Sequence, residues 1–269
     1  MNKDDKSIMY SFKVSISSSR KEMGIAAGKC AEELLCTLLS KKETVRVIMA
    51  SAPSQDDILG FLQNSIKIDW SRIEVFHMDE YVGVSPDDRV SFSNYLQRTL
   101  FDKHKVKAFH RIITNTNKPI QDVCDEYSKE LLKNPIDLVF LGIGENGHIA
   151  FNDPSMADLK DPKIMKEVSL DEVCRMQQVH DGCFPTFDAV PKTALTLTVP
   201  TLMSGAHLVC TVPTLKKNSA VKKLLLGPVS VSCPSTAMRL HPDCNLFLDN
   251  ESGRGIPSME GVETILARK

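Results

Sequence analysis

Residues 137–154 read DLVFLGIGENGHIAFNDP, an apolar, branched run that ends in glycines and is followed by a dense group of polar side chains. The run is typical of a strand that is buried on both faces of a parallel sheet. We expect the three glycines, Gly142, Gly144 and Gly147, to take positive φ and to let the backbone approach a ligand closely. Five polar side chains stand within the next nine residues: Glu145, Asn146, His148, Asn152 and Asp153.

This polar group has two interpretations. An ordinary turn after a strand, in which the imidazole caps a neighbouring carbonyl, would explain His148 alone. Such a turn does not explain five polar side chains in one short loop, because packing requires no such density. We therefore interpret the loop as a candidate functional site.

The composition excludes several classes of protein. A chain of 269 residues buries a substantial core, and we interpret it as a single domain over residues 1–269. Its hydrophobic content of 42% and charged content of 25% are ordinary for a globular protein. The net charge of -1 provides no general basic field, so we expect no nucleic-acid partner. An anionic small molecule would need only a local group of donors.

Eight cysteines are scattered along the chain, with no CxxC pair and no close spacing of cysteine and histidine. This pattern is typical of reduced, mostly buried thiols in an intracellular protein, and it contains no metal-binding motif. The N-terminal segment MNKDDKSIMYSFK is charged and lacks the apolar core of a signal peptide. We therefore expect a cytoplasmic protein that has no metal and no membrane partner. The oligomeric state stays open, and a homo-oligomer is one alternative.

Hydrophobic periodicity predicts strands that alternate with helices. The predicted strands are 12–16, 45–50, 73–77, the run that begins at 137, 194–199, 206–213 and 244–249. The predicted helices are 17–42, 56–64, 91–101, 120–132, 215–226 and a short one within 232–242. Residues 163–184 show a mixed pattern. The alternation predicts an α/β fold, a Rossmann-like, mostly parallel sheet flanked by helices.

Polar residues also follow the predicted strand at 45–50. The segment SAPSQ, residues 51–55, lies between this strand and a helix. Backbone N–H groups and the positive end of the helix dipole would favour an anion such as phosphate there. Ser54 or Asp56 acting as a plain helix cap is an equally good interpretation.

A pair of carboxylates, Asp79 and Glu80, follows the predicted strand at 73–77, and Gly83 permits a sharp turn just beyond. An acidic pair in an exposed loop is usually only solvated. However, ligands of parallel α/β sheets bind beyond the carboxyl ends of strands. This position favours a functional role for the pair.

The chain resembles the glucosamine-6-phosphate deaminase/isomerase family, whose wider superfamily includes the 6-phosphogluconolactonases. The resemblance spans nearly the whole chain and rests on these colinear segments: FHMDEYVG (76–83), GIGENGHIAFNDP (142–154), VPKTALTLTV (190–199), the lysines at 216 and 217, and SCPSTAMRLHP (232–242). The continuation HIAFNDP resembles the deaminases rather than the lactonases. The resemblance implies conversion of D-glucosamine 6-phosphate and water to D-fructose 6-phosphate and ammonia.

The same resemblance implies roles for individual residues. Asp79 would be the general base that moves a proton between C1 and C2 of the opened sugar. His148 would assist opening of the pyranose ring, with Asp153 as its carboxylate partner. These roles are chemically sensible, because a partly desolvated carboxylate has a raised pKa and suits proton abstraction near neutral pH. The expected partner is a small-molecule sugar phosphate, and no organic or metal cofactor is implied.

The phosphate group would be bound by the 51–55 loop and by Lys217, which fits the family's phosphate-binding lysine better than Lys216. Arg175 is another candidate, since its fork of donors suits phosphate. Alternatively, the lysines of this region form a solvated helix face. The full set of candidate substrate-binding residues is Ser51, Ser54, Gln55, Glu80, Gly144, Arg175 and Lys217.

Some residues depart from the family pattern. SAPSQ replaces a glycine-rich phosphate loop, and Asp153 replaces a glutamate. Asn146 stands where the best-known members have an aspartate, so that either Glu145 substitutes as the acid or ring opening is slower. The alternatives left open are a galactosamine-6-phosphate deaminase, a 6-phosphogluconolactonase, and a sensor that binds sugar phosphate without turnover.

Overall fold

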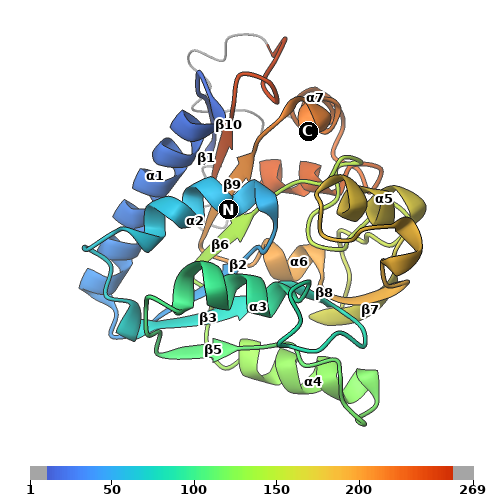
Figure 1. Cartoon of the computed structure of the whole chain (residues 1–269). Coiled ribbons are helices and arrows are strands. Elements are labelled where there is room, and N and C mark those ends of the chain that lie inside the picture. The colour runs from blue at the N-terminus through green and yellow to red at the C-terminus, as the bar shows by residue number, and fades with distance from the viewer. Residues whose placement is uncertain (1–10, 257–269) are drawn as a thin grey trace, which may run out of the picture.

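The computed structural model describes residues 11–256 and contains one large and one small sheet (Figure 1). The large sheet has seven strands in the order β1-β10-β9-β6-β2-β3-β5, and every neighbouring pair is parallel. Its strands are β1 (Ser11–Ile16), β2 (Val45–Met49), β3 (Ile73–His77), β5 (Ala108–His110), β6 (Leu138–Leu141), β9 (His207–Val212) and β10 (Asp243–Leu248). The predicted α/β fold with a mostly parallel sheet is confirmed.

Helices cover both faces of the large sheet. The α-helices of the described chain are α1 (Arg20–Lys41), α2 (Asp56–Gln63), α3 (Phe92–Leu96), α4 (Ile120–Leu131), α5 (Glu172–His180), α6 (Val199–Leu202) and α7 (Asn218–Leu226), of which α5 packs with the small sheet described below. The alternation of side chains along β6 shows how the two faces are filled. Leu138 and Phe140 pack with α1 and α2, whereas Val139 and Leu141 pack with α4 and α7. The buried central strand was therefore predicted correctly as a continuous apolar run.

The small sheet is antiparallel and was not predicted. It has the order β4-β8-β7, with strands β4 (Asp79–Tyr81), β8 (Thr193–Leu197) and β7 (Met165–Ser169). The segment of β4 had been interpreted as a loop and that of β7 as mixed. β8 had been predicted as a strand at 194–199, but its pairing with β4 and β7 had not. β4, and β5, which was also missed, have only three residues each, too few to show a period.

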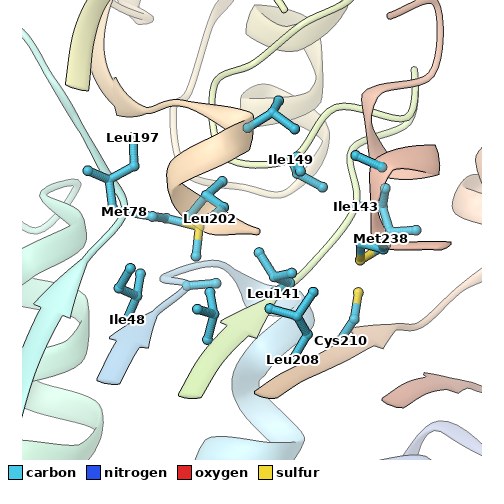
Figure 2. Close-up of a cluster of buried hydrophobic side chains, with 14 of the residues drawn as sticks. Ile48, Met78, Leu141, Ile143, Ile149, Leu197, Leu202, Leu208, Cys210 and Met238 are labelled. Atoms are coloured by element: carbon cyan, nitrogen blue, oxygen red, sulfur yellow. The ribbon is translucent and has the colours of Figure 1, made fainter. Parts of the chain in front are cut away.

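An apolar layer joins the two sheets (Figure 2). Ile48 and Leu141, near the carboxyl ends of β2 and β6, belong to the same buried cluster as Leu197 of β8 and Leu202 of α6. Met78, which connects β3 to β4, is buried in this layer as well. The layer holds the small sheet beyond the carboxyl ends of the large sheet, which is where polar loops follow the strands.

Several element boundaries differ from the prediction. The helix expected at 91–101 is α3 followed by a π-helical turn over Gln97–Phe101, and the one expected at 215–226 begins with a 3-10 turn over Leu215–Lys217. The mixed segment 163–184 contains β7 and α5, and Asp171 caps α5 by accepting a hydrogen bond from the backbone N–H of Cys174.

All eight cysteines are free. Within residues 11–256, no helix combines the length and the apolar character needed to cross a bilayer.

Helices α1 and α2 approach each other closely through two glycines. A Cβ atom on Gly24 would lie 2.3 Å from Cβ of Asp57, and one on Gly28 would lie 2.4 Å from Cγ of Phe61. Because both pairs are four residues apart, they stack along one line of contact between the helices. The glycines thus set the position of the start of α1 relative to the loop that precedes α2.

We expect the Gly24→Ala variant to lower the free energy of unfolding by about 1–3 kcal/mol, because its methyl group overlaps Asp57. Gly60→Ala, within α2, is the matched control: a Cβ there meets nothing within 4 Å, and alanine favours helix by about 1 kcal/mol over glycine. Urea unfolding of both variants measures the difference. Equal stability of the two variants would contradict the close packing of α1 and α2.

Candidate active site

One cleft opens at the carboxyl ends of four neighbouring strands, β9, β6, β2 and β3. After β2, the chain adds β3 and β5 on one side of β2. After β6, which pairs with the other side of β2, it adds β9 and β10 in the opposite direction. The order of strands therefore reverses between β2 and β6. A crevice is expected at such a reversal, because the two connecting segments turn away from each other. Six of the predicted site residues line this cleft: Ser51, Ser54, Asp79, Gly144, His148 and Lys217.

The carboxylate of Asp79 faces the cleft from β4. It was predicted to follow a strand in a loop, but it is the first residue of a strand and is 8% exposed. No hydrogen bond to this carboxylate is formed by residues 11–256. Burial, and secondarily the charge of Glu80, raise the pKa of Asp79 well above its usual range. A desolvated carboxylate without a protein partner is suited to accept a proton from a bound molecule.

Glu80 points the other way, because successive side chains on a strand alternate. Its carboxylate accepts hydrogen bonds from Oγ of Ser91 at 2.7 Å and from the backbone N–H groups of Phe92 and Ser93 at 3.2 Å each. Burial raises the pKa of Glu80, and these donors partly offset the rise. The structure therefore does not bring Glu80 into the cleft, where it had been predicted as a substrate ligand; it holds the start of α3.

The imidazole of His148 is anchored by a buried acid. Nδ1 lies 2.8 Å from Oδ1 of Asp153. Asp153 is completely buried and does not line the cleft, so it contacts the ring from the protein interior. Burial acts to raise the pKa of Asp153, but the contacts with His148 and Asn146 outweigh it and lower the pKa below its ordinary value. Asp153 is thus an anion that orients the ring. Nε2, on the opposite side of the ring, is left for the cleft.

Asn146 and Glu145 have different surroundings. Asn146 donates from Nδ2 to Oδ1 of Asp153 at 2.8 Å, and its Oδ1 accepts the backbone N–H of His148 at 3.0 Å. Glu145 is turned toward α5, where its carboxylate lies 3.7 Å from Nδ1 of His180. The hypothesis that Glu145 substitutes as the acid beside His148 is therefore not supported, because Asp153 already occupies that place. Neither residue lines the cleft itself.

The three glycines of this loop serve different purposes, and the expectation of positive φ for all three was wrong. Only Gly147 has a positive φ, of 90°. A Cβ on Gly144 would lie 2.2 Å from Cε1 of His148, so this glycine makes room for the imidazole. A Cβ on Gly142 would lie 3.0 Å from Oγ of Ser54, so this one lets the 51–55 loop approach β6.

The far part of the cleft is suited to an anion. Lys217 is 7% exposed, and none of the hydrogen bonds or ion pairs within residues 11–256 engages its amine. Burial lowers its pKa, although the charges of Asp181 and Glu145 oppose the shift. Oγ of Ser51, also in the lining, is buried without a hydrogen-bond partner. A buried amine and an unpaired hydroxyl in one cleft imply a ligand that accepts hydrogen bonds and carries negative charge.

The alternative that the lysines of this region form a solvated helix face is correct for the neighbours of Lys217, but not for Lys217 itself, which is buried. Lys216, Lys222 and Lys223 are all exposed. Lys217 precedes α7 at the end of a 3-10 turn, and this turn follows Thr214, whose φ of 79° is unusual for a β-branched residue. The backbone N–H of Thr214 is held by Asp249 at 2.9 Å. This fixed turn directs one lysine of the group inward.

Two other predicted substrate ligands lie outside the cleft. Gln55 donates from Nε2 to the carbonyl of Leu141 at 3.2 Å, so it ties the loop to β6. Arg175 donates to the carbonyls of Phe187 and Val190, and its guanidinium lies 3.9 Å from the centre of the Phe187 ring. The predicted helix cap is also absent, since α2 begins after Gln55 with no side-chain capping bond.

Some cleft residues were missed by the sequence analysis. They are Arg20, Gln177, Gln178, Asp181, Cys183 and Thr214. Four of them, Gln177, Gln178, Asp181 and Cys183, belong to α5 or to the turn after it. Two residues could have indicated that helix from the sequence: Asp171, which caps its start, and Gly182, which follows its end with a φ of 74°. Arg20 has no local signal, because it lies far from the other cleft residues along the chain.

The set formed by His148, Asp153 and Cys174 offers nitrogen, oxygen and sulfur atoms that all lie within 4.8 Å of one another. Such a set is compact enough to enclose a metal ion. However, the ring and the carboxylate already contact each other, and burial, followed by the charge of Asp153, strongly raises the pKa of the Cys174 thiol. The thiol is thus protonated and turned to Asp153, which favours a hydrogen-bonded group over a metal centre.

Comparisons with known proteins agree with this geometry. The family described as glucosamine-6-phosphate isomerases/6-phosphogluconolactonase matches residues 18–245. Glucosamine-6-phosphate deaminases of Bacillus thuringiensis (strain Al Hakam) and Bacillus cereus (strain B4264) are each 32% identical over 232 residues, which cover 86% of this chain and 84% of the relative.

Solved structures are similar as well. One described as a monomeric glucosamine-6-phosphate deaminase superposes with a TM-score of 0.81 at 26% identity, covering 90% of this chain and 99% of the other. The 6-phosphogluconolactonase of Trypanosoma brucei has a TM-score of 0.75 at 17% identity, with 92% and 99% covered. This second likeness shows that the fold is shared.

Proposed function

The chain belongs to the glucosamine-6-phosphate isomerase/6-phosphogluconolactonase family, and from this premise we propose that its cleft converts D-glucosamine 6-phosphate and water to D-fructose 6-phosphate and ammonia. The observation that carries the proposal is one cleft containing an unpaired, desolvated carboxylate, an imidazole anchored by a buried acid, and a buried amine. Aldose-ketose isomerisation of a phosphorylated sugar requires a base, a proton donor for the ring oxygen and an anion ligand.

Ring opening is the first step. His148 exchanges a proton with the ring oxygen through Nε2, and Asp153 stabilises the positive charge that the imidazole carries when it is protonated. The opened sugar presents an aldehyde at C1 and an ammonium group at C2. The proton on C2 then becomes acidic, because it is adjacent to the carbonyl.

Proton transfer between the two carbons follows. Asp79 removes the proton from C2 while one proton of the ammonium group passes to O1, which leaves an enol amine between C1 and C2. Asp79 then returns its proton to C1, and the nitrogen becomes part of an iminium at C2. Water adds to this carbon, and the C–N bond breaks to leave the ketone and ammonia. A carboxylate with a raised pKa suits both halves of the transfer, since it has to accept and release the proton.

The experiment is an assay of the purified protein for ammonia and fructose 6-phosphate, with glucosamine 6-phosphate, galactosamine 6-phosphate and 6-phosphogluconolactone supplied in parallel. We expect turnover of glucosamine 6-phosphate with equal amounts of the two products. Acid release from the lactone without ammonia would identify a lactonase instead. Binding of the sugar phosphates without turnover of any of them would identify a sensor.

Asn146 provides a further prediction, since the best-known family members have an aspartate at this position. Nδ2 of Asn146 lies 2.8 Å from Oδ1 of Asp153, so Asn146→Asp would place two carboxylates in contact and raise the pKa of one of them. We expect a lower kcat for this variant, with a shifted pH profile. A higher kcat than the unaltered protein would show that the acid adjacent to His148 is limiting. Asn146→Ser, which adds no charge, is the control.

A further inference from the structure

Arg20 is a cleft residue that neither the sequence motifs nor the steps above use. It is the first residue of α1, and it borders the cleft beside the loop 51–54. A positive charge at the first turn of a helix is unfavourable, because the helix dipole is positive there. Ser19 already caps this helix by accepting the backbone N–H of Glu22, so Arg20 is not needed for capping. Neither the helix dipole nor capping therefore explains why an arginine occupies this position.

Two contacts hold the guanidinium in place. Nε donates to Oδ2 of Asp57 at 2.5 Å, and Nη2 donates to the carbonyl of Pro53 at 2.6 Å. The close packing of Gly24 against Asp57 fixes the helix that carries this acid. A guanidinium has five N–H groups, of which these contacts use two. The other three form no hydrogen bond with the part of the chain that the structure describes, and the side chain is 38% exposed at the edge of the cleft.

Two positions of the loop next to Arg20 offer no free backbone N–H. Pro53 has no N–H, and the N–H of Gln55 is used by the carbonyl of Ala52. A phosphate bound at this loop would therefore lack N–H groups that a glycine-rich loop supplies. Arg20 contacts Pro53 itself, so its free N–H groups lie beside the position where backbone donors are missing.

Charged groups of both signs surround this end of the cleft. Lys217 contributes a buried positive charge, while Asp181, in the lining, contributes a negative one. Asp57 balances Arg20, and Asp56 lies 3.9 Å from Nη2. The charge available for an anion thus comes mainly from Lys217. What Arg20 adds is a planar set of N–H donors whose direction is fixed before a ligand binds.

We infer that Arg20 is a direct ligand of the phosphate group of the substrate, and that it supplies, from α1, donors that Pro53 withholds from the loop. The inference deepens the proposed function and rests on it for the identity of the sugar. It assigns the phosphate three side-chain ligands, Arg20, Ser51 and Lys217. The bound group is the phosphate monoester dianion.

The test measures binding, which needs no turnover. Titration calorimetry at pH 7.5 with fructose 6-phosphate and with inorganic phosphate compares Arg20→Ala with Lys21→Ala, the exposed neighbour on the same helix. We expect Arg20→Ala to weaken both ligands by about 10- to 100-fold, the effect of a hydrogen bond to a charged group. Lys21→Ala should bind as the unaltered protein does. Arg20→Lys, which keeps the charge but not the fork, should be intermediate.

A second variant separates a ligand from a structural support. If Arg20 only ties the loop to α2, Asp57→Asn should weaken binding as much as Arg20→Ala does. If Arg20 binds phosphate, Asp57→Asn should bind as tightly as before or more tightly, because the amide oxygen of asparagine still accepts from Nε and keeps the guanidinium in place, while the competing negative charge is removed. Equal binding by Arg20→Ala and Lys21→Ala, or equal losses in Arg20→Ala and Asp57→Asn, would overturn the inference. Arginine-dependent binding without ammonia release would reject the proposed function and leave the inference standing.

Discussion

Asp79→Asn is expected to reduce kcat by about 10²- to 10⁴-fold, the usual contribution of a positioned general base. The amide keeps the shape of the carboxylate but does not accept a proton from C2. Binding should be nearly unchanged, because the residues proposed to bind the phosphate, Arg20, Ser51 and Lys217, are not altered. Ammonia release measures the loss, and calorimetry with fructose 6-phosphate measures binding. Near-normal turnover by this variant would mean that another group is the base.

The pH dependence follows from the direction of the pKa shift. Burial raises the pKa of Asp79 well above its ordinary value, and the base acts only when it is ionised. As the pH falls through this raised pKa, kcat/KM is expected to fall, at a higher pH than an ordinary aspartate would show. The residual activity of Asp79→Asn should lack this acid limb. An acid limb near the pKa of a solvated aspartate would contradict a desolvated base.

Stability provides an independent readout of the same group. A carboxyl whose folded pKa is raised contributes stability below its unfolded pKa and loses that contribution as the pH rises through the folded value. Above the unfolded pKa, the buried and unpaired Asp79 therefore costs stability, and we expect Asp79→Asn to have a higher Tm than the unaltered protein at neutral pH. Glu80→Gln is the matched comparison. Burial raises the pKa of Glu80 as well, but an amide nitrogen in place of one carboxylate oxygen would face N–H groups at the start of α3 and leave a donor without an acceptor, so this change should lower Tm instead.

His148→Gln is expected to have the second large effect, a loss of kcat of about 10²-fold or more. Glutamine does not exchange a proton with the ring oxygen, so opening of the pyranose becomes slow. The open-chain analogue 2-amino-2-deoxyglucitol 6-phosphate, which has no ring to open, should bind the variant as well as it binds the unaltered protein. Loss of this binding would mean that His148 holds the substrate rather than opening it.

Asp153→Asn tests whether the buried acid acts through the imidazole. Oδ1 of Asp153 accepts contacts from both Nδ1 of His148 and Nδ2 of Asn146. Without the carboxylate, Nδ1 of His148 loses the anion that orients the ring. We expect a lower kcat with little change in KM, because the ring no longer presents Nε2 to the ring oxygen in a fixed direction. An unchanged kcat would show that the acid only packs against the ring.

The fold class and the centre of the site follow from local sequence. An apolar run with glycines after it is recognisable without its neighbours, because burial on both faces of a parallel strand demands apolar residues at every position. Since parallel strands end at one edge of a sheet, the polar residues after those strands were expected to meet. Asp79, His148 and Lys217 do line one cleft.

The tertiary structure alone decided what each polar side chain faces. Asp79 and Glu80 are adjacent and chemically alike, and only their alternation on β4 sends one to the cleft and the other to α3. Gln55 and Arg175 have donors suited to phosphate, but neither lines the cleft, because carbonyl groups distant in sequence accept from Nε2 of Gln55 and from Nη2 of Arg175.

Arg20 illustrates the converse. Nothing near it in sequence indicates a ligand, and it reaches the cleft because two glycines let α1 pack tightly on α2. The physical reason is the same in every case. Periodicity and turn chemistry are local properties that the sequence determines directly, whereas a hydrogen-bond partner or the approach of two helices depends on residues brought together only when the chain has folded.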